Sequence, residues 1–392
     1  MRPIRSAVFV YGVPLGTGGL GVQAGNALRA LALAADRVHA VGPGPGADAG
    51  AGSLPNVAWH VPPAFPKGLL RWTPLRRRVG LAQLWADRRI GRHAASLLDS
   101  LRPDLCYTFT QVGLEALGRA KAAGVPTVVE SPNGHIRAFR DVYVTEARQW
   151  CGATFHGHPT PAMVARVEAE IATADRIRVS SEWSKRSLAA GGVPVDRVSS
   201  LQQPVDLAGY APAPPVVRPE GPLRICFVGS LDLRKGFVYL LRAARRLAPD
   251  VPVRLHFVGA TGDRCSRMLL DRERQGLDVT VAPGDPREPL ARSDLFVLPT
   301  LEDGSPFAAA EAMACGRPVI TTDCTGAAEW IRPGETGWIV PARSDDALAG
   351  ALAAAWTARG GLAEMGRLAR RDTERRADAD CDRAVADWLM RC

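Results

Sequence analysis

Residues 303–322 read DGSPFAAAEAMACGRPVITT, and the rest of this 392-residue chain can be interpreted around them. An acidic residue and a glycine turn lead into a helix of small residues, which ends at a Gly-Arg-Pro turn before a buried strand at 319–322. The N–H groups of 304–307 lie at the helix start, where unpaired donors and the helix dipole favour a polar ligand. Glu311 follows Asp303 by about two helical turns, so one ligand of sugar-nucleotide length can meet both. The stretch predicts a ligand-binding corner, and the alternative is a capped helix that only packs its alanines on a sheet.

Length and composition limit what this corner can belong to. A chain of 392 residues is long enough for two domains, each with its own core. The hydrophobic share of 46% and the charged share of 23% are typical of a soluble globular protein, and no apolar run has the length of a membrane span. The N-terminal MRPIRSAVFVYGV resembles a signal peptide, but its short apolar run continues into GVPLGTGGLG, so we interpret it as a first buried strand. We therefore expect a cytoplasmic protein.

Cysteines and net charge give two further expectations. Eight cysteines are scattered along the chain with no CxxC pair and no Cys/His cluster at metal-ligand spacing, which predicts buried thiols in a reducing compartment. A net charge of +9 favours anionic ligands or surfaces, but it does not choose among nucleotides, nucleic acid and lipid.

The first 210 residues predict a doubly wound parallel sheet. Strand-like segments alternate with helical ones, at 7–11, 37–41, 57–61, 105–109, 127–130 and 177–181. Before a helix at 22–35, a glycine-rich turn places Gly18 and Gly19 where the backbone can approach an anion. The GxGxxG spacing and an acidic residue at the ribose-binding distance are missing, so a nicotinamide site is not expected.

Two further features of this half are candidate sites. Residues 67–93 interleave Leu and Trp with many Arg, a pattern that can rest on an anionic membrane and make the protein peripheral at the inner membrane face. We favour the ordinary alternative, a packed helix with a solvated basic face. His135 lies in a Pro-Asn-Gly turn just beyond a strand, where ligands bind in open α/β sheets, although a lone turn histidine is more often a surface residue.

A Pro-rich stretch, APAPPVVRPEGP, divides the chain. A second alternation follows it, with strands at 223–228, 253–258, 279–282, 295–298 and 319–322 and helices between them. The prediction is a first domain at 1–210, a linker at 211–222, a second domain at 223–375 and a C-terminal helix at 376–392 that can return to the first domain.

The turn GSLDLRKG opens the second domain after its first strand. Ser230, Arg234 and Lys235 lie at a helix start, where two cations and backbone donors can hold a diphosphate. Basic turn residues are usually just solvated. Cations for phosphate together with carboxylates for hydroxyls favour a nucleotide sugar as the ligand.

Two long segments carry a family resemblance. Residues 228–247, VGSLDLRKGFVYLLRAARRL, and residues 298–331, LPTLEDGSPFAAAEAMACGRPVITTDCTGAAEWI, resemble family 4 of the retaining glycosyltransferases, also called glycosyl transferases group 1. That family has the GT-B fold, in which two Rossmann-like doubly wound parallel-sheet domains face each other across a cleft. The resemblance is specific over 223–345 and looser but collinear over the first domain.

The resemblance implies a role for each candidate. Asp303 would hydrogen-bond hydroxyls of the donor sugar, and Glu311 the ribose diol. Lys235 would neutralise the leaving diphosphate, and His135 would lie beside the transferred sugar. The implied catalytic residues are His135, Lys235 and Asp303, and the implied donor-binding residues are Gly18, Gly19, Ser230, Arg234, Lys235, Asp303, Gly304, Ser305, Phe307 and Glu311.

The sequence departs from the family pattern at three positions. The first corner carboxylate is usually Glu, whereas here it is Asp303 with Glu302 beside it. From the register of the corner we assign the role to Asp303 and expect Glu302 to point away. Ser230 stands where many members have Arg, so Arg234 is the candidate for the second cation. Pro306 has no N–H, which removes one backbone donor from the loop.

The implied reaction is transfer of a hexosyl group from a UDP- or GDP-linked sugar to a glycan, lipid-linked or small-molecule acceptor, with retention at the anomeric carbon. No metal or other cofactor is expected, because basic residues take the place of a DxD-like acidic pair. No nucleic-acid partner is expected. The alternatives are a sugar-nucleotide epimerase of the same fold and a non-catalytic sugar-nucleotide-binding protein.

Overall fold

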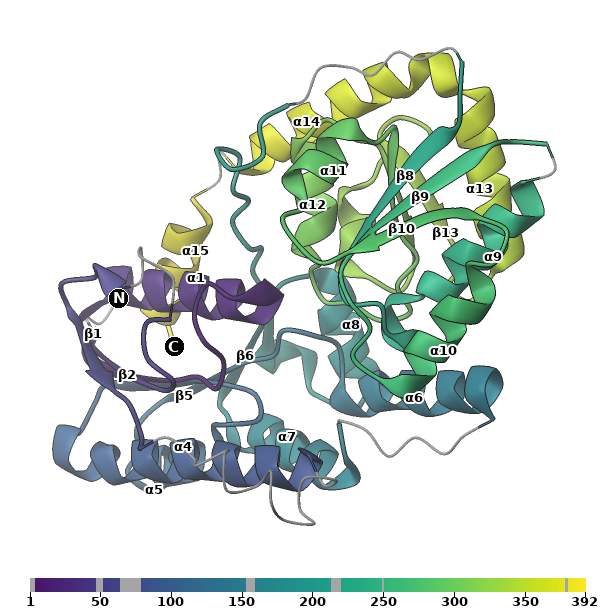
Figure 1. Ribbon diagram of the computed structural model, residues 1–392. Helices are drawn as coiled ribbons and strands as arrows, with labels where there is room; N and C mark the ends of the chain where they lie inside the picture. The colour runs from purple at the N-terminus through teal and green to yellow at the C-terminus, as the bar shows by residue number, and fades with distance from the viewer. Residues whose placement is uncertain are drawn as a thin grey trace. The chain divides into compact units, whose positions relative to one another are not determined.

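The computed structural model describes residues 4–46, 52–63, 79–152, 159–212, 220–248, 250–377 and 380–392. The chain divides into two compact units, each with its own parallel sheet (Figure 1). Unit 1 comprises residues 1–140, 156–204 and 380–392, and unit 2 comprises residues 141–155 and 205–379.

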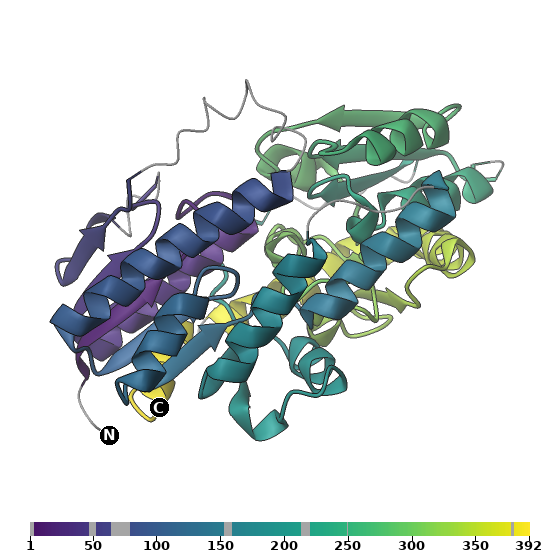
Figure 2. The ribbon, with the colours of Figure 1, turned by 90° about the horizontal axis from the view of Figure 1, so that it is seen from below.

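Unit 1 is a three-layer α/β unit. Its described residues form a seven-stranded sheet in the order β3-β2-β1-β4-β5-β6-β7. Helices α1 and α15 lie on one face, and α4, α5 and α7 lie on the other (Figures 1 and 2). The elements are β1 (Ile4–Val10), α1 (Gly18–Ala34), β2 (Ala35–Val41), β3 (Val57–His60), α4 (Val79–Leu101), β4 (Leu105–Phe109), α5 (Leu114–Ala122), β5 (Thr127–Glu130), α6 (Ile136–Cys151), α7 (Pro161–Thr173), β6 (Arg176–Val179), α8 (Glu182–Ala190), β7 (Val198–Ser200) and α15 (Cys381–Leu389).

Unit 2 repeats this architecture. In its described part the sheet has the order β10-β9-β8-β11-β12-β13. Helices α9, α10 and α13 lie on one face, and α12 and α14 lie on the other (Figure 1). The elements are β8 (Leu223–Val228), η3 (Leu233–Lys235), α9 (Phe237–Leu247), β9 (Val253–Val258), α10 (Arg264–Glu273), β10 (Asp278–Ala282), α11 (Arg287–Arg292), β11 (Leu295–Leu298), α12 (Phe307–Ala314), β12 (Val319–Thr322), η4 (Gly326–Trp330), β13 (Gly337–Val340), α13 (Asp345–Thr357) and α14 (Leu362–Ala377).

Each sheet has one point where the strand order reverses. In unit 1 the chain passes from β1 outward to β3 and then returns to place β4 on the other side of β1. In unit 2 the chain likewise passes from β8 outward to β10 and then returns to place β11 on the other side of β8. The carboxyl ends of strands at such a point splay their connecting loops apart, and ligands of open α/β sheets bind there.

The predicted fold class is confirmed, because both sheets are parallel and have helices on both faces. Strands β4, β5, β8, β9, β11 and β12 begin and end at the predicted residues. Parallel strands are buried on both faces and therefore appear in the sequence as continuous apolar runs. The sequence does not predict β7 and β13, because VSS contains a single apolar residue and GWIV begins with glycine, a residue that is depleted in strands.

The predicted first domain at 1–210 differs from unit 1 in two respects, since residues 141–155 and 205–210 belong to unit 2. Helix α6 begins in unit 1 and continues into unit 2, where Val142 and Ala147 join the hydrophobic core. The fully buried Glu146 accepts hydrogen bonds from Tyr239 Oη at 2.8 Å and Arg343 Nε at 2.7 Å. These buried contacts hold the second half of α6 in unit 2.

The C-terminal helix α15 lies in unit 1. It packs on α1, and its residues Val385, Ala386 and Leu389 join the core that includes β1 and β4. Arg29 of α1 pairs with Asp382 at 3.3 Å. The chain therefore returns to unit 1 after completing unit 2.

The expectation of eight thiols is also wrong. Cys151 of α6 and Cys265 of α10 form a disulfide within unit 2, with Cα atoms 6.2 Å apart. The two residues are separated by 114 positions, so sequence spacing gives no hint of the pairing. The other six cysteines are free: Cys106, Cys226, Cys315 and Cys381 are buried, Cys324 is partly buried and Cys392 is exposed.

The basic segment 67–93 is described only from residue 79 onward, so Arg76, Arg77 and Arg78 lie outside the described residues. In α4, Leu84 and Leu98 are buried, whereas Trp85 is half exposed with the Arg89 guanidinium 5.5 Å from its ring centroid. Among the helices that the structure describes, none combines the length and the apolar character needed to cross a membrane.

Candidate functional site

The candidate site of unit 2 is formed by the loops that follow β8 and β11, at the reversal point of its sheet. Gly236 has a φ of +69°, and a Cβ added there would lie 2.0 Å from the carbonyl oxygen of Pro299, so only glycine fits. The Leu301 N–H donates to the Arg234 carbonyl oxygen at 2.7 Å. The two loops therefore pack backbone against backbone, which brings residues 68 positions apart into contact.

Two cations and two carboxylates meet where these loops touch. The Lys235 ammonium donates to the Asp303 carboxylate. Arg234 Nη1 lies 3.3 Å from Glu302 Oε2 and 3.8 Å from Asp303 Oδ2. All four side chains are largely buried, between 2% and 14% exposed. The structure thus brings together Arg234, Lys235 and Asp303, as the sequence predicts.

Backbone hydrogen bonds fix the position of Asp303. Its N–H donates to the Cys324 carbonyl at 3.2 Å, and its carbonyl accepts from the Gly326 N–H at 3.0 Å. These two hydrogen bonds attach the Asp303 corner to the loop that follows β12. Burial opposes the charge of Arg234, but Asp303 and Glu302 outweigh it and hold the guanidinium pKa above its ordinary value.

The expectation that Glu302 points away is wrong. Its carboxylate contacts the same Arg234 nitrogen that Asp303 approaches, and its carbonyl oxygen accepts from that nitrogen at 2.7 Å. Only 2% of the Glu302 side chain is exposed. The tight turn brings both adjacent carboxylates to one guanidinium, although only Asp303 bonds to Lys235.

The remaining residues of the two loops have different environments. Ser230 Oγ donates to Asp232 at 2.6 Å, and Asp232 caps η3 by accepting from the Lys235 N–H at 3.0 Å. Ser305 Oγ is buried and has no hydrogen-bond partner among the described residues. Gly304 and Ser305 precede Pro306, and Phe307 begins α12. A ligand at this helix start would satisfy the unpaired Ser305 hydroxyl.

Glu311 lies on α12 and has a partner that the sequence does not reveal. Its carboxyl group hydrogen-bonds the Tyr210 hydroxyl, and burial raises the Glu311 pKa to about 7 despite this bond. Tyr210 lies immediately before the predicted linker at 211–222. The Arg370 guanidinium donates a hydrogen bond to the Tyr210 carbonyl oxygen at 2.7 Å. A carboxyl group with such a pKa is about half ionised at neutral pH and can accept hydrogen bonds from a diol.

The other predicted residues belong to unit 1. Gly18 and Gly19 form the exposed first turn of α1, which begins four residues earlier than predicted. A Cβ on Gly18 would meet no atom within 4 Å, so this helix start is open.

His135 is buried, although a turn position favours a surface residue. It precedes α6, and its ring packs so closely on Gly191 that a Cβ there would lie 2.3 Å from it. Burial lowers the His135 pKa, against the opposing effect of Glu168, whose carboxylate lies 4.0 Å from Nε2. The imidazole is therefore mainly neutral at pH 7.

Comparison with known proteins supports the resemblance seen in the sequence. Residues 222–357 match the model of the family described as glycosyl transferases group 1. The chain is 32% identical over 189 residues to a putative colanic acid biosynthesis glycosyltransferase, WcaL, of Escherichia coli K12, covering 45% of this chain and 46% of that protein. It is 31% identical over 238 residues to a D-inositol 3-phosphate glycosyltransferase of Rhodococcus erythropolis, covering 55% and 54%. The chain thus spans about half the length of the curated relatives it matches.

Solved structures are similar over nearly the whole chain. HepE of Anabaena in complex with UDP-glucose has a TM-score of 0.67 and 16% identity, covering 99% of this chain and 100% of that one. At this identity the likeness concerns the fold, and the predicted GT-B fold class with its two Rossmann-like domains is confirmed. The resemblance to group 1 is confirmed over residues 222–357, and membership of family 4 stays a prediction.

Proposed function

We propose that this chain, whose residues 222–357 match the glycosyl transferases group 1, is a retaining glycosyltransferase that uses a nucleoside diphosphate hexose as donor. The observation that carries the proposal is the cluster of Arg234, Lys235 and Asp303 at the strand reversal of unit 2. Cations suit a diphosphate, and a carboxylate suits sugar hydroxyls. That HepE, which shares the fold, was crystallised with UDP-glucose supports this class of donor.

Donor binding would rearrange one contact of the cluster. Without ligand, Lys235 is paired with Asp303. A diphosphate that takes the ammonium as its counter-ion would release the Asp303 carboxylate for hydroxyls of the sugar. Arg234 keeps Glu302 as its partner, so a buried cation next to Lys235 stays neutralised.

The reaction itself places new negative charge on the diphosphate. The bond between the anomeric carbon and the diphosphate oxygen breaks, and the acceptor oxygen attacks from the same face. The acceptor proton passes to the departing phosphate. A preorganised ammonium stabilises the charge that develops on this leaving group.

A panel of UDP- and GDP-linked hexoses tests the function, with release of free nucleotide as the measurement. We expect one donor to release nucleotide slowly by hydrolysis and faster with an acceptor, and the product to keep the anomeric configuration of the donor by NMR. An epimerase would instead convert the bound sugar without releasing nucleotide. A non-catalytic binding protein would bind a donor and leave it intact.

Metal independence is a separate part of the proposal. If Lys235 and Arg234 neutralise the diphosphate, turnover should be unchanged in a chelator such as EDTA. The same donor and acceptor are assayed with chelator alone and with chelator plus excess magnesium or manganese. Loss of activity in chelator that either ion restores would contradict this assignment.

The two adjacent carboxylates are expected to differ in importance. Asp303→Asn should lower kcat by roughly 10- to 150-fold, because a charge-assisted hydrogen bond to a sugar hydroxyl contributes about 1.5–3 kcal/mol. Glu302→Gln should lower it much less, since Glu302 contacts Arg234 and not Lys235. Thermal unfolding of both variants separates loss of folding from loss of catalysis. A larger fall in kcat for Glu302→Gln would reverse the assignment.

A further inference from the structure

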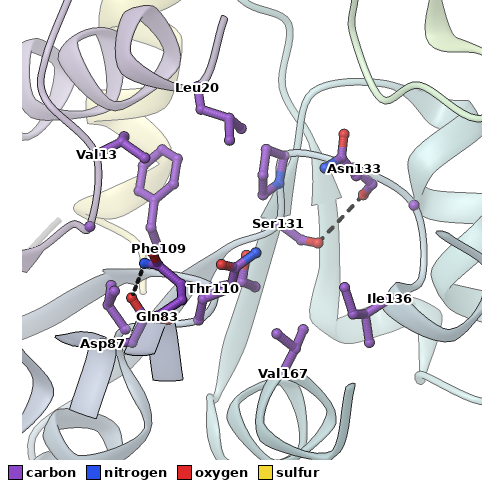
Figure 3. A pocket seen from close by; sticks show the side chains of 15 residues that line it. Val13, Leu20, Gln83, Asp87, Phe109, Thr110, Ser131, Asn133, Ile136 and Val167 are labelled. Atoms are coloured by element: carbon purple, nitrogen blue, oxygen red, sulfur yellow. Dashed lines mark hydrogen bonds between the residues drawn. The ribbon is translucent and has the colours of Figure 1, made fainter. Parts of the chain in front are cut away.

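Unit 1 contains a cavity that the donor site does not use. It has a volume of about 80 Å³ and lies at the carboxyl ends of β1, β4 and β5, beside the strand reversal. Figure 3 shows apolar side chains around it, with Leu20 and Val13 on one side and Ile136 and Val167 on another. Gln83 and Asp87 of α4 add polar groups to this mostly apolar wall (Figure 3).

Asp87 is a buried carboxyl group with one unsatisfied oxygen. Only 1% of the residue is exposed. Its Oδ1 accepts a hydrogen bond from Gln83 Nε2 at 2.8 Å, whereas Oδ2 has no partner among the described residues. Burial raises the Asp87 pKa to about 6, against the opposing effects of Gln83 and Arg166. A buried polar atom without a partner destabilises the fold unless a ligand or water completes it.

Among the residues that the structure describes, the surroundings of Asp87 carry an excess of negative charge. Arg166 is the cation that acts on it, and this guanidinium already holds Glu115 by two hydrogen bonds, at 2.9 and 2.5 Å. Arg166 Nε also lies 3.6 Å from Glu170 Oε1. Glu170 in turn accepts from the N–H groups of residues 111, 113 and 114, and of these Gln111 lines the cavity. In the described part of unit 1, one guanidinium therefore faces three carboxyl groups.

We propose that this cavity receives the amino group of an acceptor, which binds as an ammonium ion to Asp87 Oδ2. The proposal rests on the proposed glycosyltransferase function and specifies its acceptor as a small amino-bearing compound, such as an amino sugar. A volume of about 80 Å³ is large enough for an ammonium group. An ammonium ion satisfies the free oxygen and offsets the excess charge. A hydroxyl would satisfy only the oxygen, and a phosphate would be repelled.

Three probes that share one sugar ring and differ in charge test the proposal: glucosamine, glucose and glucose 6-phosphate. Each is titrated by ligand-observed NMR into the wild-type chain, Asp87→Asn and Asp99→Asn. Asp99→Asn is the matched control, because Asp99 is on the same helix but is exposed and paired with Arg119. Asparagine at position 87 keeps the acceptor for Gln83, so this variant should fold.

We expect the wild-type chain and Asp99→Asn to bind glucosamine at least about tenfold more tightly than glucose, and glucose 6-phosphate most weakly. In Asp87→Asn the advantage of glucosamine over glucose should disappear. Equal affinities of the wild-type chain for glucosamine and glucose, no saturable binding of glucosamine, or an advantage that persists in Asp87→Asn would each overturn the proposal.

A parallel titration with UDP and GDP separates this inference from the proposed function. If neither nucleotide binds, the glycosyltransferase assignment fails, while the three probes still report directly on the cavity. If a nucleotide binds and glucosamine has no advantage, the function stands and the acceptor assignment is wrong.

Discussion

Lys235→Ala should lower kcat by about two to three powers of ten. Removing one preorganised group that stabilises developing negative charge costs about 3–4 kcal/mol in the transition state, and each 1.36 kcal/mol is a factor of ten. The Lys235 side chain is only 14% exposed and already ion-paired, so its position is set before a donor arrives. Steady-state kinetics with saturating donor measure the loss in kcat.

Lys121→Ala is the matched control for this substitution. Lys121 is exposed and pairs with Asp175 at 3.0 Å in unit 1, so its loss should change stability by only about 0.2–1 kcal/mol and leave kcat unaffected. A Lys235→Ala variant that is folded, binds nucleotide and turns over at a near-normal rate would remove Lys235 from the mechanism.

Glu130→Ala should destabilise unit 1 by about 3–5 kcal/mol, because it leaves a buried cation without its partner. Arg178 Nη1 lies 2.9 and 2.8 Å from the two oxygens of Glu130, and both residues are at most 1% exposed. Glu130 also accepts from Tyr107 Oη and from Gln23 Nε2, the latter at 2.7 Å. Its removal therefore leaves several buried donors unsatisfied at once.

Hydrogen exchange read on peptides of β5 and β6 measures this destabilisation within unit 1. The double variant Glu130→Ala with Arg178→Met is the control, since it removes both charges. It should be more stable than Glu130→Ala alone, because no unpaired charge stays buried. If the second substitution instead adds a further loss, the ion pair is not the cause of the effect.

Much of the fold follows from local sequence. Buried parallel strands such as β8 and β11 appear as apolar runs, and the turns after them carry glycine and polar residues at fixed offsets. That pattern was sufficient to predict two doubly wound sheets and to assign Lys235 and Asp303 to the ends of two strands. Both strands border the reversal of one sheet, so their loops had to come together.

The pairings within the cluster did not follow from spacing. The sequence predicts that Glu302 points away, but the packing of Gly236 on Pro299 brings Arg234 within reach of both carboxylates. Likewise, the bond between Tyr210 and Glu311 joins residues about a hundred positions apart. Such contacts depend on how loops pack, which no local pattern encodes.

The sequence by itself thus determined the strand and helix alternation, the two sheets and the charged residues at their strand ends, because these depend on burial and backbone geometry over a few residues. Only the tertiary structure decided that α6 continues into unit 2, that Cys151 meets Cys265 there, and that Asp87 is buried with one oxygen that has no partner among the described residues. Each of these features depends on which side chains from distant segments pack together. The periodicity within one segment carries no information about the distant segment that packs against it.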